Sequence, residues 1–149
     1  MTVLKLIDTK SYLDALSDLT ENGHTVSTAI SGGSMLPFLA PGRDFAILKK
    51  PDSPLKKGDI VLFRRADESY ILHRIRHITK DGYYIIGDSQ NVTEGPVEES
   101  RIVAVVVAVK RKGKSITPKN AVWKFYSTVW LRIIPLRRHI FRIRAIFGK

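Results

Sequence analysis

Apolar residues recur at helical spacing near the start of the chain. They would share one face of a helix, and they are Tyr12, Leu13, Leu16 and Leu19. The pair Asn22-Gly23 follows, and both residue types end helices well because they tolerate a left-handed backbone. The pattern therefore predicts a helix from Thr9 to Asn22.

The pattern changes beyond Thr25 to short apolar or alternating runs separated by turn signals such as Pro41-Gly42 and Asp81-Gly82. Five runs have the length and the residue types of strands, namely FAIL, DIVLF, YILHRI, YYII and IVAVVVAV. This character ends near Lys114, and β-branched and aromatic runs between turns are typical of strands. We expect five or six strands of a mainly antiparallel β domain.

Beyond Pro118 the pattern becomes helical again, in two pieces that we expect Pro135 to separate. The chain has 149 residues, 44% of them hydrophobic, which suffices for one well-formed core. We therefore expect an N-terminal helix within residues 1–25, a β domain over residues 26–114 and a helical tail over residues 115–149. The fold class is mainly β with flanking helices.

Composition restricts the chemistry. The chain has no cysteine, which excludes disulfides, thiolate metal sites and cysteine nucleophiles. Its four histidines are scattered, and the only close pair, His73 and His77, falls on an expected strand end and turn, where this spacing gives no shared metal face. We expect neither a metal nor a cofactor.

Charge suggests the partners and the location. The formal net charge is +11, from 25 basic and 14 acidic residues, so polyanions are the partners to consider. Acidic residues interrupt the apolar runs at the N-terminus, so no signal peptide is expected there. The longest apolar run of the body, Ile102 to Val109, is too short to cross a bilayer. We expect a cytoplasmic protein.

The stretch ISGGSMLPFLAPGRD contains the candidate chemistry. Gly32 and Gly33 directly precede Ser34, and glycines permit a tight turn or a close approach to the backbone. A serine hydroxyl becomes a good nucleophile when a base takes its proton, and a histidine such as His73 can do so near neutral pH. A carboxylate such as Asp88 could orient the imidazole.

Five segments carry a resemblance in their order along the chain: SGGSMLP, LKKGDIVLFRR, YILHRIRHI, YYIIGDSQ and EESRIVAVV. Between about Val26 and Val109 they resemble the successive boxes of the clan that joins type I signal peptidases with self-cleaving SOS-type repressors. The resemblance implies a coiled antiparallel β-sheet or partial barrel. It also implies Ser34 as nucleophile, His73 as base in place of the usual lysine, and assistance from Asp88. A histidine base is similar to that of archaeal and endoplasmic-reticulum signal peptidases and some bacterial relatives.

The chain departs from the family pattern at three points. Bacterial signal peptidases commonly have a serine where this chain has Gly32, so the oxyanion donors would be backbone N–H groups of Ser34 and Gly33. The Gly-Asp box continues with Ser89-Gln90-Asn91, which leaves a fourth catalytic residue without a match. An N-terminal transmembrane anchor is not seen, which disfavours a housekeeping signal peptidase.

Each candidate also has a structural interpretation. Ser34 could be a turn or cap serine, His73 a core histidine, and Asp88 the cap of the Gly87 turn. We assign Met35 to an apolar wall of the substrate pocket and Pro37 to the rigid exit from the serine turn. Lys56 and Lys57 precede a Gly-Asp turn in a solvated segment, so neither replaces the missing lysine base.

The tail from Trp123 to Lys149 interleaves aromatic and aliphatic residues with seven basic residues and contains no acid. This composition is typical of a helix at the interface of an anionic membrane. The residues expected to contact lipid are Trp123, Trp130, Arg132, Arg137, Arg138, Arg142 and Arg144. The alternative is an ordinary helix packed on the β domain. A nucleic-acid partner is disfavoured because no recognition motif accompanies the charge.

Two functions remain open. The first is a serine endopeptidase with a Ser34/His73 dyad, assisted by Asp88, that cleaves a small-residue site in an extended leader or signal-like peptide laid against a strand edge. It would lie in the cytoplasm, peripheral to the inner face of the membrane. The second is a non-catalytic or self-regulating clan member that binds peptides or membranes. A repressor is disfavoured, since no helix-turn-helix precedes Val26 and no Ala-Gly or Cys-Gly cleavage site precedes Ser34.

Overall fold

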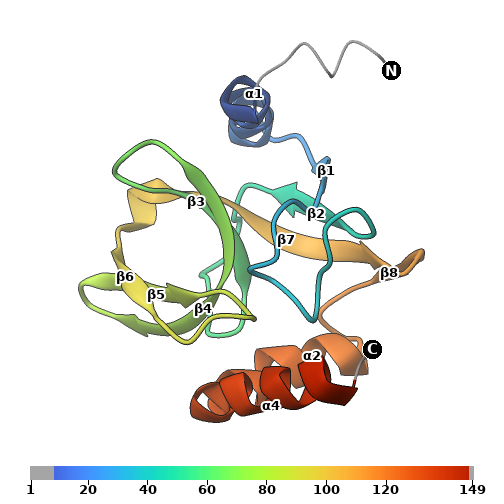
Figure 1. Ribbon diagram of the computed structural model, residues 1–149. Helices are drawn as coiled ribbons and strands as arrows, with labels where there is room; N and C mark the ends of the chain where they lie inside the picture. The colour runs from blue at the N-terminus through green and yellow to red at the C-terminus, as the bar shows by residue number, and fades with distance from the viewer. Residues whose placement is uncertain (1–8, 148–149) are drawn as a thin grey trace.

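A computed structural model describes residues 9–147 of the protein. Residues 1–8 and 148–149, which belong to the expected N-terminal and C-terminal segments, lie outside the described residues. Figure 1 shows a β-sheet in the middle of the molecule, one helix above it and the C-terminal helices below. The predicted fold class, mainly β with flanking helices, is confirmed.

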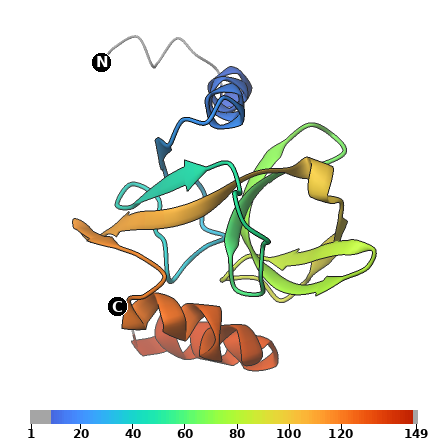
Figure 2. The same cartoon turned by 180° about the vertical axis from the view of Figure 1, so that it is seen from behind.

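One antiparallel sheet forms the body of the molecule, and its path β1-β2-β7-β3-β4-β5-β6 is open at both ends (Figure 2). A short eighth strand, β8, pairs with β7 outside this path. A 3-10 helix, η2 (Glu99–Arg101), precedes β7. The strands are β1 (Val26–Ala29), β2 (Phe45–Lys49), β3 (Ile60–Arg64), β4 (Tyr70–Thr79), β5 (Gly82–Ile86), β6 (Glu94–Val97), β7 (Ile102–Arg111) and β8 (Lys114–Ile116).

The five apolar runs of the sequence correspond to β2, β3, β4, β5 and β7. The described residues contain eight strands rather than the five or six expected, because the short strands β1, β6 and β8 lack a long apolar run. Strand β6 includes Gly95-Pro96, whose sequence indicates a turn. A proline fits there because β6 is at the end of the sheet, where one edge needs no hydrogen-bond donor.

Alternate residues of the strands face two apolar clusters on opposite sides of the sheet. On β3, Ile60 and Leu62 join the larger cluster, whereas Val61 and Phe63 join the smaller one. Side chains alternate along a strand with a period of two, so each strand contributes to both clusters. The same alternation decides which side of β4 each polar side chain faces.

The N-terminal helix α1 (Thr9–Glu21) confirms the helix predicted from apolar spacing. Its Leu16 is 4% exposed and lies in the larger cluster, with Tyr12 and Leu13 packed against it. Burying one leucine side chain contributes about 2 kcal/mol, so this helix is fixed to the sheet mainly by its apolar face.

The tail forms three helices, α2 (Ala121–Ser127), α3 (Val129–Arg132) and α4 (Ile134–Phe147). The Asn120 side chain caps α2 by accepting from the N–H of Val122 at 2.8 Å. The expectation that Pro135 separates two helical pieces is wrong, because Pro135 lies in the first turn of α4. A proline is accommodated there because N–H groups of a first turn have no intrahelical acceptor.

Candidate active site

The loop that carries Ser34 needs its glycines at specific positions. Gly32 has φ = +71°, which glycine adopts without strain, whereas Gly33 has no positive φ. Beyond Ser34 the loop closes on itself, since Leu36 N–H donates to Gly33 O at 3.2 Å and Leu39 N–H donates to Met35 O at 2.9 Å. Ser34 is thereby presented on a turn, partly exposed.

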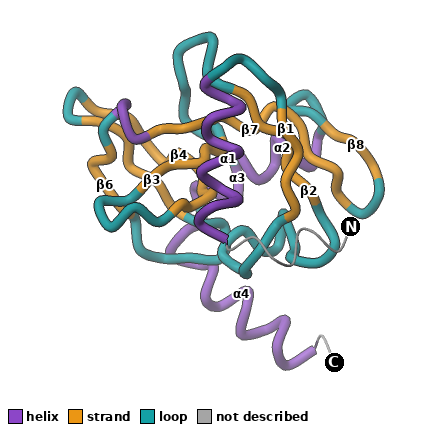
Figure 3. Tube along the Cα trace, turned by 90° about the horizontal axis from the view of Figure 1, so that it is seen from above, coloured by secondary structure: helices purple, strands orange, loops and turns teal. Residues whose placement is uncertain are grey.

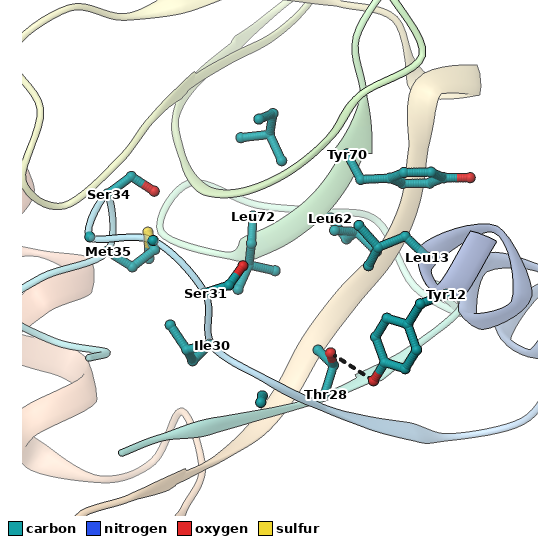
Figure 4. Close-up of a pocket in the computed structure, with 14 residues that line it drawn as sticks. Tyr12, Leu13, Thr28, Ile30, Ser31, Ser34, Met35, Leu62, Tyr70 and Leu72 are labelled. Carbon is teal, nitrogen blue, oxygen red and sulfur yellow. Dashed lines mark hydrogen bonds between the residues drawn. The ribbon is translucent and has the colours of Figure 1, made fainter. Parts of the chain in front are cut away.

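Ser34 lies at one end of an open groove of about 660 Å³. The groove is lined by residues 28–35, by two residues of α1 and by residues of β3 and β4. Figure 4 shows Ser34 and Met35 at one end of the groove, Tyr70 at the other and Leu72 between them. Met35 is 2% exposed and forms part of the wall, while Pro37 is not among the lining residues.

His73 lies in β4, where it is 3% exposed. Its ring lies 6.2 Å from that of Phe63, on the side of the smaller apolar cluster. Burial lowers the pKa of the imidazole from 6.5 to about 4, although the charge of Glu94 acts in the opposite direction. The imidazole is therefore neutral at pH 7 and able to accept a proton.

The backbone of Ser34 lies against Gly87, the residue that follows β5. The last pair between β4 and β5 is Arg74 with Ile86, so His73 and Gly87 are the first residues beyond the paired segment. A Cβ on Gly87 would lie only 2.6 Å from the carbonyl oxygen of Ser34. The absence of a side chain at Gly87 therefore permits this close approach.

Within residues 9–147, no hydrogen bond joins Ser34 and His73, and the buried Nδ1 of His73 has no partner. The Oγ and N–H of Ser34 also have no hydrogen-bond partner among the described residues. Catalytic hydrogen bonds often tighten only when substrate binds. The arrangement thus leaves the hydroxyl and the backbone N–H of Ser34 available at one end of the groove, whereas His73 is not among the residues that line it.

Asp88 contacts Arg74 rather than His73. Its two carboxylate oxygens accept from Nε and Nη2 of Arg74, each at 2.9 Å, and both side chains are fully buried. His73 and Arg74 are consecutive residues of β4, so their side chains face opposite sides of the sheet. The contact between Asp88 and the imidazole, which the resemblance implied, is therefore absent here.

The carboxylate whose charge acts on the His73 imidazole is Glu94. Both oxygens of Glu94 bind the guanidinium of Arg65, at distances from 2.8 to 3.2 Å. The negative charge of Glu94 raises the pKa of the imidazole, and the positive charge of Arg65 offsets part of this rise. Glu94 was not a candidate from the sequence, because its segment resembles a turn.

Three residues expected to contact a membrane are instead buried in the protein. Trp123 is 3% exposed, Trp130 is 5% exposed and Arg137 is fully buried. Trp123 packs edge-on against Phe38, with ring centroids 5.6 Å apart. As folded, these three cannot contact lipid, whereas the other four residues are exposed, namely Arg132, Arg138, Arg142 and Arg144.

Sequence reasoning missed the residues that surround the Gly87 turn. Arg74 and Arg137 resemble surface cations in the sequence, and only the fold shows that both are fully buried. The indole N–H of Trp130 donates to Asp88 O at 2.7 Å. The sequence held one weak signal for the burial of Arg74. Arg74 directly follows His73, and if both faces of the strand are covered, consecutive residues are both buried, one on each face.

The described residues hold no group of three or more histidine or acidic side chains placed to bind a metal ion. Over the same residues, no helix combines the length and the apolar character that crossing a bilayer requires.

Comparison with known proteins identifies the class. The sequence model of the Peptidase S24-like family matches residues 3–107, which is more than half of the chain. Neither the curated proteins nor the solved structures give a match to this chain. The protein therefore belongs to the Peptidase S24-like family, the serine peptidases of the SOS-repressor and signal-peptidase type, and the resemblance of its sequence boxes to this clan is confirmed. The match does not test the histidine-base branch, which stays a prediction. Membership indicates a serine peptidase or a self-cleaving, repressor-like protein.

Proposed function

We propose that the protein is a serine endopeptidase in which Ser34 is the nucleophile and His73 the general base. The observation that carries the proposal is that Ser34, whose hydroxyl has no partner among the described residues, lies at the end of the groove with its carbonyl against Gly87. Gly87 is the first residue after β5, which pairs with the strand that holds the buried neutral imidazole of His73. Histidine serves as a base when it is neutral and has a free lone pair.

The reaction would proceed through an acyl-enzyme. Ser34 Oγ attacks the carbonyl carbon of the scissile bond and its proton passes to His73, while the Ser34 N–H stabilises the developing oxyanion. When the C–N bond breaks, His73 gives this proton to the leaving amine. Water then attacks the ester and transfers a proton to His73, which returns it to Ser34 Oγ as the carboxylic acid leaves.

Two unpaired strand edges support an extended peptide as the substrate. Strand β1 pairs only with β2, and residues 70–73 of β4 lie beyond the last residue that pairs with β5. Residues of both edges line the groove, among them Thr28 and Leu72. A peptide in extended conformation could pair with either edge, and the apolar lining favours apolar side chains.

Covalent labelling tests this proposal. A fluorophosphonate probe should modify the intact protein once, at Ser34, because Ser34 Oγ displaces fluoride from phosphorus. Ser34→Ala should abolish labelling, whereas Ser31→Ala, which changes the neighbouring exposed serine of the same groove, should leave it unchanged. Absence of labelling in the wild-type protein would favour the alternative, a non-catalytic or self-regulating member of the family.

We also propose that the protein binds the surface of an anionic membrane through the outward face of α4. Figure 3 shows α4 extending away from the sheet. Exposed apolar residues recur along one side of this helix, namely Leu136, Ile143 and Phe147, which are 55%, 55% and 80% exposed. Arg142 and Arg144 flank them and are exposed, and residues 115–147 include no acid. Apolar side chains between cations suit an interfacial helix.

Vesicle binding tests this second proposal. The full chain should co-sediment with vesicles rich in phosphatidylglycerol at low salt, and the bound fraction should fall as salt rises. Arg138→Gln/Arg142→Gln should weaken binding several-fold, since each cation near such a surface contributes about 1 kcal/mol. The matched control Lys57→Gln/Lys80→Gln removes the same charge from exposed positions outside the tail. An equal loss in both variants would contradict a specific role for α4.

A further inference from the structure

The turn that follows β5 holds the backbone on both sides of the nucleophile. Ser89 N–H donates to Ser34 O at 3.0 Å, and Ser89 Oγ donates to Gly33 O at 3.0 Å. The carbonyl of Gly33 and the N–H of Ser34 belong to one planar trans peptide, so they point in opposite directions. The bond from Ser89 Oγ therefore orients the Ser34 N–H, which is the main candidate for the oxyanion donor.

The C-terminal helices hold the same turn from its other side. Trp130 of α3 donates its indole N–H to Asp88 O at 2.7 Å. Arg137 of α4 donates from Nη1 to Gly87 O at 3.1 Å and to Gln90 O at 2.9 Å. Three carbonyls of the turn thus accept hydrogen bonds from two side chains of the tail, and both side chains are buried.

Arg137 is an unusual structural residue because no described carboxylate lies within ion-pair distance of it. Burial lowers its pKa to about 10, so the guanidinium is still charged at pH 7. Its other hydrogen bonds go to Trp130 O, at 3.2 and 3.3 Å. A buried charge is costly, whereas the rigid fork of a guanidinium can fix several carbonyls in one geometry. The gain from this arrangement is then orientation rather than net stability.

These two side chains come from outside the part of the chain that matches the family. The match ends at residue 107, whereas α3 and α4 span residues 129–147. Ser89 lies within the match, at the point where the Gly-Asp box of this chain departs from the usual sequence. The connection from α4 to Ser34 is therefore a feature of this chain rather than one that family membership supplies.

We propose that the C-terminal helices are part of the catalytic apparatus: Trp130 and Arg137 fix the Gly87–Gln90 turn, and Ser89 orients the peptide that carries the oxyanion donor. The proposal rests on the peptidase function proposed above. Ser89, Trp130 and Arg137 are positioning residues, because none of them contacts the reacting atoms.

Labelling kinetics of the full chain test the role of Ser89. In the fluorophosphonate reaction, the Ser34 Oγ–P bond forms, the P–F bond breaks, fluoride leaves and the Ser34 proton passes to His73. Ser89→Ala should lower the maximal labelling rate about tenfold or more without changing the probe concentration at half-maximal rate, because the phosphoryl oxygen needs the same donor. Ser89→Thr, which keeps the hydroxyl, should restore most of the rate.

The control for this experiment is Ser53→Ala, an exposed serine outside the groove. It should label at the wild-type rate, and all variants should have the wild-type melting temperature. Equal maximal rates for Ser89→Ala and wild type would overturn the assignment of Ser89 while leaving the peptidase function intact.

Hydrogen exchange tests the tail without requiring activity. In the full-length Arg137→Met and Trp130→Phe variants, the amides of Leu36 and Leu39 in the Ser34 loop should exchange about tenfold faster than in wild type, with β3 unchanged. Arg137→Lys should show a smaller increase. If Arg137→Met does not fold, Arg137→Lys and Trp130→Phe give the same comparison. Unchanged exchange in the loop would overturn the proposal, even if Ser34 proved unreactive and the peptidase function failed.

Discussion

Consecutive residues of β4 lie in opposite environments. On one face, Arg74 is fully buried and donates to Asp88, to Gly58 O at 3.0 Å and to Ser127 Oγ at 3.2 Å. On the other face, His73 is nearly as buried and its ring lies beside that of Phe63, but its Nδ1 has no hydrogen-bond partner. One polar group is thus fully paired and the other is not.

The difference separates a structural group from a reactive one. A buried guanidinium needs carboxylate or carbonyl acceptors, because a buried charge without them costs several kcal/mol. A neutral imidazole can be buried at smaller cost, and a lone pair that no donor occupies can accept a proton from a nucleophile. Burial without pairing at His73 is consistent with a base, and burial with full pairing at Arg74 is consistent with a scaffold.

The largest expected effect is on turnover, through His73. His73→Ala should lower turnover on the order of 10³-fold or more, since loss of a triad member has effects of this size in serine peptidases. The exposed His77 of the same strand, which stacks on Tyr84 at 4.4 Å, gives a matched control. His77→Ala should retain full activity. Turnover of His73→Ala near the wild-type value would contradict the assignment of His73 as the base.

The next-largest effect is on the free energy of unfolding, through the buried ion pair of Arg74 and Asp88. Asp88→Ala leaves Arg74 as a buried charge without its carboxylate, and the free energy of unfolding should fall by about 3 to 5 kcal/mol. The double variant Arg74→Met/Asp88→Leu should recover most of this loss, because it removes both charges. Urea denaturation of the three proteins measures the coupling. If Asp88→Ala were as stable as wild type, the ion pair would not be structural.

A third test uses pH. The His73 imidazole has a pKa of about 4 in the folded protein and 6.5 in an ordinary environment, so the unfolded chain binds more protons between these values. The stability that neutral His73 contributes is therefore fully present above pH 6.5 and is lost as pH falls to about 4, by roughly 3 kcal/mol.

The unfolding free energy of His73→Gln, measured against that of wild type at each pH, isolates this contribution. The difference between the two proteins should change between pH 6.5 and 4 and be constant at higher pH. Turnover should also persist below pH 6, because the base is still neutral there. A wild-type activity profile centred on pH 6.5 would show that His73 titrates as an exposed imidazole.

The smallest effect concerns the loop that presents Ser34. Gly32→Ala places a Cβ at φ = +71°, which costs about 1 kcal/mol, and it should lower turnover by disturbing the oxyanion donor. At Gly33, where φ is not positive, an added Cβ would meet only Leu36 Cδ1, at 3.3 Å. Gly33→Ala should therefore have the smaller effect. A reversed order of the two variants in turnover assays would contradict this account of the glycine pair.

The sequence predicted local elements well because their signals are local. Helix α1 followed from apolar spacing, and β2, β3, β4, β5 and β7 followed from apolar runs between turns. The exposed positions of Lys56 and Lys57 followed from a turn signal. Strand β6 did not, because a Gly-Pro pair indicates a turn unless the position at the edge of a sheet is known.

The site was predicted unevenly. The order of the sequence boxes pointed to Ser34, His73 and Asp88, and the family match covers all three. The partner of Asp88 was not predictable, because Asp88 and Arg74 are brought together by the pairing of β4 with β5. Among the tail residues, composition alone could not distinguish Arg137, which binds carbonyls in the interior, from Arg138, which is exposed.

The sequence by itself determined the family, the strand pattern and the residue types available for chemistry. These depend on short-range periodicity and on the order of motifs, which a chain carries before it folds. Tertiary structure alone decided that His73 is unpaired while Arg74 is paired, and that Arg137 holds the turn beside Ser34. Burial and pairing depend on residues distant in the chain, so they exist only once the sheet and the C-terminal helices have packed together.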